Sequence, residues 1–143
     1  MRNIIVEKTS NNTYVVKADT ERFGKQEIMF ESYCKVECVR YIIRTAVKLY
    51  VVTKQECYLA VLLRWMDERK RNQYDENRGR NSFFTSHYGF SMTYVFMAED
   101  GGLYIKCRGC RSSFSVFFNA DGTTAKRAPK VKNMRRIGFS YNF

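Results

Sequence analysis

The chain has 143 residues, of which 45% are hydrophobic and 15% aromatic, so it is long enough for a hydrophobic core and too apolar for a disordered protein. Its 25 Lys and Arg residues outnumber 14 Asp and Glu residues, which gives a net charge of +11. No run approaches roughly eighteen uncharged apolar residues, which excludes a membrane-spanning helix. Residues 1–7 become charged too soon for a signal peptide, so we expect an intracellular, cytoplasmic protein with no membrane partner, folded as one domain over residues 1–143.

Two β-rich runs open the chain, at residues 3–8 and 13–18, and a turn sequence at residues 9–12 separates them. This pattern predicts a β-hairpin. A polar loop then leads to a third short strand at residues 27–31.

A long helical signal follows. Between residues 33 and 52 the charged residues recur every three or four positions, which is the spacing of one stripe on a helix. These residues are Glu37, Arg40, Arg44 and Lys48. We expect this helix to end near Val51. Thr53 and Glu56 have the spacing of a capping box, so a second helix should begin at Lys54. The alternative is a short strand over residues 49–52.

The second helix should end with a basic last turn over residues 68–71. Its buried residues recur at helical spacing and are Leu59, Leu62, Leu63 and Met66. Residues 73–81 are polar and lack periodicity, so we expect an exposed, mobile loop there. It serves either as a plain connection, the simpler interpretation, or as a lid or contact loop.

From residue 82 the chain changes to a β pattern. Alternating residues at 92–97, 103–107 and 114–118, separated by glycine-containing turns, predict a meander of three antiparallel strands, and residues 137–143 are typical of a closing edge strand. The predicted fold class is α+β. It consists of an N-terminal β-hairpin plus a third strand, two consecutive α-helices and an antiparallel β-meander, with the helices packed on one sheet face.

Positive charge is concentrated near the end of the chain. Residues 1–100 carry a net charge of +3, whereas residues 101–143 carry +8. This asymmetry is typical of a surface that neutralises phosphates. The basic segment 123–136 has little core pattern of its own, so we expect the contact to centre there. The candidate nucleic-acid-binding residues are Lys106, Arg108, Arg111, Lys126, Arg127, Lys130, Lys132, Arg135 and Arg136.

Aromatic residues lie among and after these cations. Because unpaired bases stack on aromatic rings, such a segment contains both components of a nucleic-acid site. The alternative is a solvated basic surface with the aromatic side chains in the core. The residues concerned are Tyr104, Phe114, Phe139, Tyr141 and Phe143.

Cys107 and Cys110 form a C-x-x-C motif between two expected strands, which is the geometry of half a zinc ribbon. A complete site needs two further ligands, for which the candidates are Cys34 with Cys38, Cys57 or His87. The alternative is that the cysteines are small core residues, so that the protein needs no cofactor. Five cysteines without a secretion signal do not predict a disulfide framework.

The leading functional hypothesis is a small, non-enzymatic protein that binds DNA or RNA through phosphate contacts of its C-terminal basic segment. The alternative is a compact inhibitor or adaptor of phage or mobile-element type that docks on an acidic protein. A third hypothesis is a metal-dependent nuclease, for which Glu27, Glu31 and Lys106 are the available residues.

Overall fold

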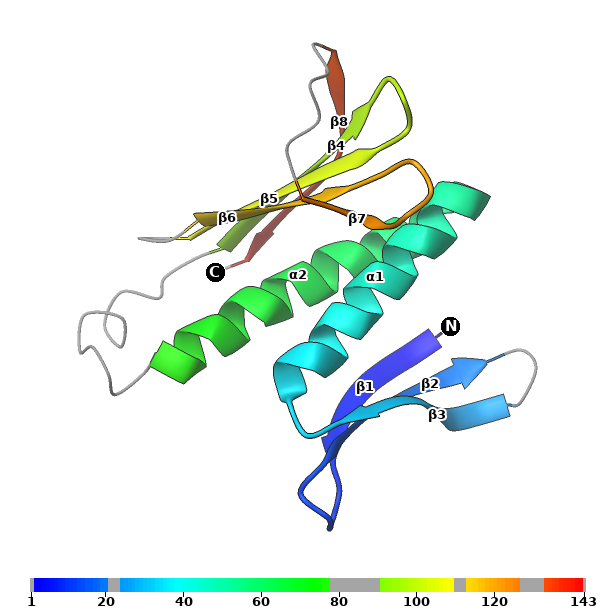
Figure 1. Ribbon diagram of the computed structural model, residues 1–143, viewed down its shortest axis with the longest axis vertical. Coiled ribbons are helices and arrows are strands. Elements are labelled where there is room, and N and C mark those ends of the chain that lie inside the picture. The colour runs from blue at the N-terminus through cyan, green and yellow to red at the C-terminus, as the bar shows by residue number, and fades with distance from the viewer. Residues whose placement is uncertain (1, 21–23, 78–90, 110–112, 127–132, 143) are drawn as a thin grey trace. The chain divides into compact units, whose positions relative to one another are not determined.

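The computed structural model describes residues 2–20, 24–77, 91–109, 113–126 and 133–142 (Figure 1). In these residues the chain forms a three-stranded antiparallel sheet, two helices and a five-stranded antiparallel sheet, in that order. This order confirms the predicted α+β fold. The chain divides into two compact units, Met1–Ile42 and Ile43–Phe143, with the boundary inside the first helix. The expectation of a single domain over residues 1–143 stays a prediction.

The first unit contains a sheet of order β1-β2-β3, formed by β1 (Arg2–Lys8), β2 (Tyr14–Thr20) and β3 (Gly24–Ser32). The predicted hairpin is confirmed, and Thr9 N donates to Thr13 O at 2.8 Å to close its turn. The third strand begins three residues earlier than the sequence pattern indicated, because pairing with β2 continues to Gly24. Glycine suits this position, since its φ of +91° lies in the left-handed region.

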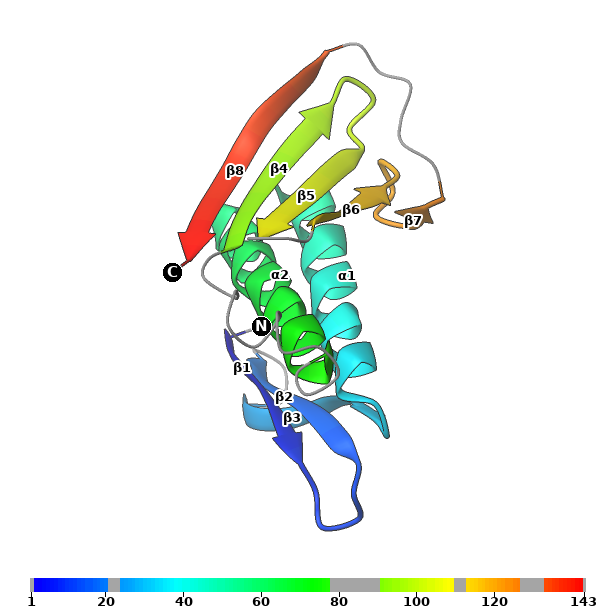
Figure 2. The ribbon, with the colours of Figure 1, turned by 90° about the vertical axis from the view of Figure 1, so that its left-hand side faces the viewer.

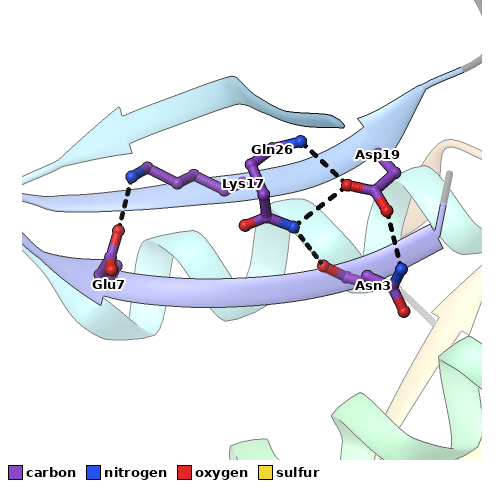
Figure 3. A network of polar contacts seen from close by, with 5 residues as sticks. All are labelled: Asn3, Glu7, Lys17, Asp19 and Gln26. Atoms are coloured by element: carbon purple, nitrogen blue, oxygen red, sulfur yellow. Dashed lines mark hydrogen bonds and ion pairs between the residues drawn. The ribbon is translucent and has the colours of Figure 1, made fainter. Parts of the chain in front are cut away.

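A polar network fixes the end of this sheet (Figure 3). The Asp19 carboxylate accepts hydrogen bonds from Asn3 Nδ2 at 2.7 Å, Gln26 N at 2.9 Å and Gln26 Nε2 at 3.2 Å. The hydrogen bond from Asn3 is the main reason why the pKa of Asp19 lies below its ordinary value. Further along the strands, Lys17 Nζ and Glu7 Oε2 form an ion pair at 2.6 Å. These five polar residues thus satisfy one another.

The two helices are α1 (Lys35–Thr53) and α2 (Glu56–Asn77). Residues 49–52 are helical, so the alternative of a short strand is wrong. The predicted capping box is also wrong, because Thr53 closes α1 by donating its hydroxyl to Leu49 O at 2.7 Å. Lys54, with a φ of +57°, then ends the helix in the left-handed conformation, and its N donates to Tyr50 O at 2.7 Å.

Helix α2 runs past its predicted basic last turn and ends at Asn77. Residues 73–77, expected in a mobile loop, are therefore helical, while residues 78–81 lie outside the described part. The reason is the intrinsic helix propensity of the residues at this end of α2. Residues 68–73 are dominated by Glu, Arg, Lys and Gln, which favour a helix without any apolar periodicity. Among the described residues, neither helix combines the length and the apolar character that crossing a bilayer requires.

The second unit contains a sheet of order β7-β6-β5-β4-β8. The predicted meander is β4 to β6, and the predicted closing strand is β8, an edge strand that pairs with β4. The segment expected to lack pattern, 123–136, contains β7 and the start of β8. The strands are β4 (Ser91–Ala98), β5 (Leu103–Gly109), β6 (Ser113–Phe118), β7 (Thr124–Ala125) and β8 (Met134–Asn142).

Helix α2 packs on one face of this sheet, where it contacts β4, β5 and β8. Val95, Ile105 and Cys107 are buried on that face. Gly138 lies opposite Val95, and a Cβ added to it would lie 3.3 Å from Leu59 Cδ1. The absence of a side chain at Gly138 therefore lets α2 approach the sheet closely.

Candidate nucleic-acid interface

The five-stranded sheet has a second face, opposite the one that α2 covers. Side chains alternate between faces along a strand, so the register with the buried residues identifies its members. Tyr94 lies opposite Lys106 and Phe139, and Met92 lies opposite Arg108 and Tyr141. In Figure 2 the sheet stands in front of the helices, and no described helix of this unit crosses the side turned to the viewer. We call this surface the aromatic–basic face, which comprises Met92, Tyr94, Phe96, Tyr104, Lys106, Arg108, Ser115, Phe117, Arg136, Phe139 and Tyr141.

A row of aromatic rings crosses this face from β8 to β6. The ring centroids are 5.1 Å apart for Phe139 and Tyr94, 6.3 Å for Tyr94 and Phe96, and 5.7 Å for Phe96 and Tyr104. Phe117 ends the row, 5.0 Å from Tyr104. Such contacts stabilise by about 0.5–1.5 kcal/mol each beyond the apolar area that they bury. The rings in the middle of the row are half-buried by their neighbours, whereas Phe139 and Tyr141 on the edge strand are 46% and 49% exposed.

A β-bulge decides which residues of β8 belong to this face. Gly138 pairs with Val95 and Arg136 pairs with Phe96, so Ile137 is an extra residue in β8. In a regular strand, positions 136 and 139 would lie on opposite faces, because their separation is odd. The bulge brings both to the same face, where Arg136 Cζ lies 5.8 Å from the centroid of the Phe139 ring, a cation–π arrangement.

The charge on this sheet is entirely positive. Its five strands contain Lys106, Arg108, Arg135 and Arg136 but no Asp or Glu. The ion pairs among the described residues, Lys17–Glu7 and Arg40–Glu37, both lie in the first unit. The cations of the aromatic–basic face therefore have no acidic partner within the described part of the chain.

The structure brings together three of the nine predicted contact residues, namely Lys106, Arg108 and Arg136. Arg135 lies on the side of α1, where its charge partly offsets the rise in the pKa of Tyr50 that burial and Glu56 cause. Lys126 is exposed, just after the short edge strand β7. The remaining predicted contacts lie outside the described residues and are Arg111, Arg127, Lys130 and Lys132.

Two of the predicted aromatic residues, Tyr104 and Phe139, belong to the ring row, and Tyr141 lies beside it on the same face. The Phe114 side chain and Phe143 lie outside the described part. Tyr94, Phe96 and Phe117 also belong to the row but were not among the predicted contacts. Alternation had already placed the first two on one side of a strand, but nothing in the sequence showed that this is the side that no described helix covers.

The C-x-x-C motif is described only at Cys107, because Cys110 lies outside the described residues. The Cys107 thiol is buried on the face toward α2, and Thr93 Oγ1 donates to its Sγ at 3.6 Å. Cys38 is also buried, which raises the pKa of its thiol, whereas Cys34 and Cys57 are exposed. Within the described ranges no three His, Cys, Asp or Glu side chains gather as metal ligands. His87 lies outside these ranges.

No protein-family model, curated protein or solved structure matches this chain. The chemistry of the aromatic–basic face is therefore the basis for assigning a function.

Proposed function

We propose that the protein binds nucleic acid, without catalysing a reaction, through the aromatic–basic face. Lys106, Arg108 and Arg136 contact phosphates there, and Lys126 and the other basic residues of the segment 123–136 extend the positive field. The observation that supports this proposal is the combination of cations and aromatic rings on a sheet face that no described helix covers and whose strands contain no acidic residue. Cations release counterions when they neutralise phosphates, and that release supplies affinity without sequence specificity.

The aromatic rings favour nucleic acid over an acidic protein as the partner. An acidic protein surface would pair with the cations but would leave the ring row facing charged groups. A nucleic acid offers phosphates to the cations and π-faces to the rings. Exposed apolar area of this kind marks a binding surface.

Salt-dependent binding tests the proposal directly. Fluorescence anisotropy with labelled DNA and RNA oligonucleotides should give affinities that fall steeply with salt. The variant K106A/R108A/R136A should bind more weakly, and the slope of log affinity against log salt should decrease by roughly 2 to 3, since each lost phosphate contact removes about 0.7–0.9.

The matched control is K8A/K25A/K35A, which removes the same charge from exposed positions of the first unit. It should retain nearly all of the affinity. Equal losses in the two variants would show that only net charge matters, and the proposal would be wrong. A pull-down with and without nuclease treatment separates the protein-partner hypothesis, because a captured protein that survives the nuclease identifies a protein partner.

A further inference from the structure

The most exposed rings of the aromatic–basic face lie on one strand. Phe139 and Tyr141 are two residues apart on β8, on the same side of the sheet, and each is about half exposed. Among the described strands, β8 is the outermost on this side of the sheet and has no further strand beside it (Figure 2). Arg136 lies against the Phe139 ring and adds a positive charge at that end of the pair.

The spacing of the two rings differs from the spacing of bases in a duplex. Residues two apart on an antiparallel strand are about 6.8 Å apart. Neighbouring bases in one strand of a duplex are about 3.4 Å apart along the helix axis. Two adjacent bases can therefore stack on the two rings only after they have separated from each other. A duplex cannot meet this requirement, since its bases are stacked and paired.

The cations on β5 repeat with the same spacing as the rings. Tyr141 shares a cross-strand row with Met92 and Arg108, and Phe139 shares the next such row with Tyr94 and Lys106. Strands two apart in a sheet are separated by roughly 10 Å, a distance that the long side chains of Lys and Arg shorten considerably. Each exposed ring is thus matched with one cation, in two parallel rows.

From this arrangement we infer that the face binds unpaired, single-stranded nucleic acid, with two neighbouring bases stacked on Phe139 and Tyr141. The strand follows β8, and Lys106 and Arg108 contact the phosphates of these nucleotides. The inference rests on the proposed function and adds the class of ligand, a single strand rather than a duplex. Stacking uses the face of a base and not its hydrogen-bonding edge, so binding tolerates many sequences.

The test uses the full chain and four twelve-nucleotide probes: oligothymidylate, oligouridylate, a DNA duplex of the same length, and an abasic strand that keeps the phosphates but lacks bases. The two single strands with bases should bind more tightly than the duplex. Phe139→Ala and Tyr141→Ala should each weaken their binding roughly 5- to 150-fold, the effect of losing one base–aromatic stack. Binding of the abasic strand should not change.

Three further variants separate stacking from folding. Tyr141→Phe keeps the ring and should bind like the parent, whereas Phe139→Leu keeps apolar volume without a ring and should lose most of what Phe139→Ala loses. Tyr33→Ala removes a tyrosine that is 82% exposed in the first unit and should have no effect. Unchanged circular dichroism and urea midpoints show that the variants are folded.

Equal affinity for oligothymidylate and duplex, together with no effect of the ring variants, would overturn the inference. The proposed function would stand in that case if K106A/R108A/R136A still weakened binding. No binding of any probe would overturn both. The thymidylate and uridylate arms distinguish DNA from RNA as the preferred source of the single strand.

Discussion

The two sheets of this protein differ in the balance of basic and acidic residues on their strands. The strands of the first sheet contain four basic residues (Arg2, Lys8, Lys17, Lys25) and four acidic residues (Glu7, Asp19, Glu27, Glu31). Those of the second contain four basic residues (Lys106, Arg108, Arg135, Arg136) and no acidic residue. Polar groups of the first sheet bond one another, as in the ion pair of Lys17 with Glu7. Charge that a fold leaves uncompensated on an ordered face is available to a ligand.

Reversing charge on the second sheet should have the largest effect. The variant K106E/R136E gives this sheet the mixed signs of the first. It should lose about 100-fold or more in affinity for nucleic acid, because two charge-assisted contacts of about 1.5–3 kcal/mol each are lost and replaced by repulsion. Fluorescence anisotropy measures the loss. The matched control K8E/K25E reverses two exposed charges in the first sheet and should change affinity much less.

Crowding the opposite side of the second sheet should change stability. In Gly138→Val the new side chain meets Leu59, whose Cδ1 would lie 3.3 Å from the added Cβ. Overpacking of this kind costs about 1–3 kcal/mol of unfolding free energy. Urea denaturation measures this cost, and the double variant G138V/L59A should recover part of it. A Gly138→Val protein as stable as the parent would contradict the close approach of α2.

Breaking the ion pair of the first sheet should have a smaller effect. Glu7→Gln removes the partner of Lys17, and both side chains are partly exposed to solvent. Exposed pairs contribute about 0.2–1 kcal/mol, so the urea midpoint should fall slightly. The decrease should become smaller in high salt, since screening weakens the pair in the parent. A salt-independent loss would indicate that Glu7 acts through packing.

The smallest effect should be a pH dependence of the first sheet. The hydrogen bond from Asn3, followed by that from Gln26 N, holds the pKa of Asp19 below its ordinary value of 3.8. A depressed pKa means that the folded state binds fewer protons than the unfolded chain at low pH. The stabilisation is therefore present above that ordinary value and is lost as the pH falls further. Asp19→Asn should lose less stability than the parent between about pH 6 and pH 2.5, as urea midpoints at both values will show.

The fold class could be predicted because turns and alternation are local signals. Both strands of the hairpin, the three strands of the meander and the closing edge strand follow directly from them. Helix ends were harder to predict from the sequence, because a threonine such as Thr53 can cap either the helix before it or the helix after it. The extension of α2 to Asn77 was missed because periodicity reports burial, whereas the end of α2 depends on helix propensity.

The candidate site could be predicted only in part. The charge asymmetry pointed to the third of the chain that contains Lys106, Arg108 and Arg136, which the structure places on the aromatic–basic face. The position of the ring row could not be predicted, since Met92, Tyr94 and Phe96 are themselves apolar or aromatic and would fit a buried face as well as an exposed one. The placement of Arg135 and Arg136 on opposite faces of the sheet could not be predicted either. It depends on how β8 pairs with β4, two strands far apart in sequence.

The extra residue Ile137 makes this interface sensitive to how β8 pairs with β4. Regular pairing of the same strand, without the bulge, would leave composition and net charge unaltered, yet it would exchange Arg135 and Arg136 between the two sides of the sheet. A chain can thus move a cation from one side of a sheet to the other by a change in register alone. Insertions and deletions that alter this register are consequently as significant for binding as substitutions are.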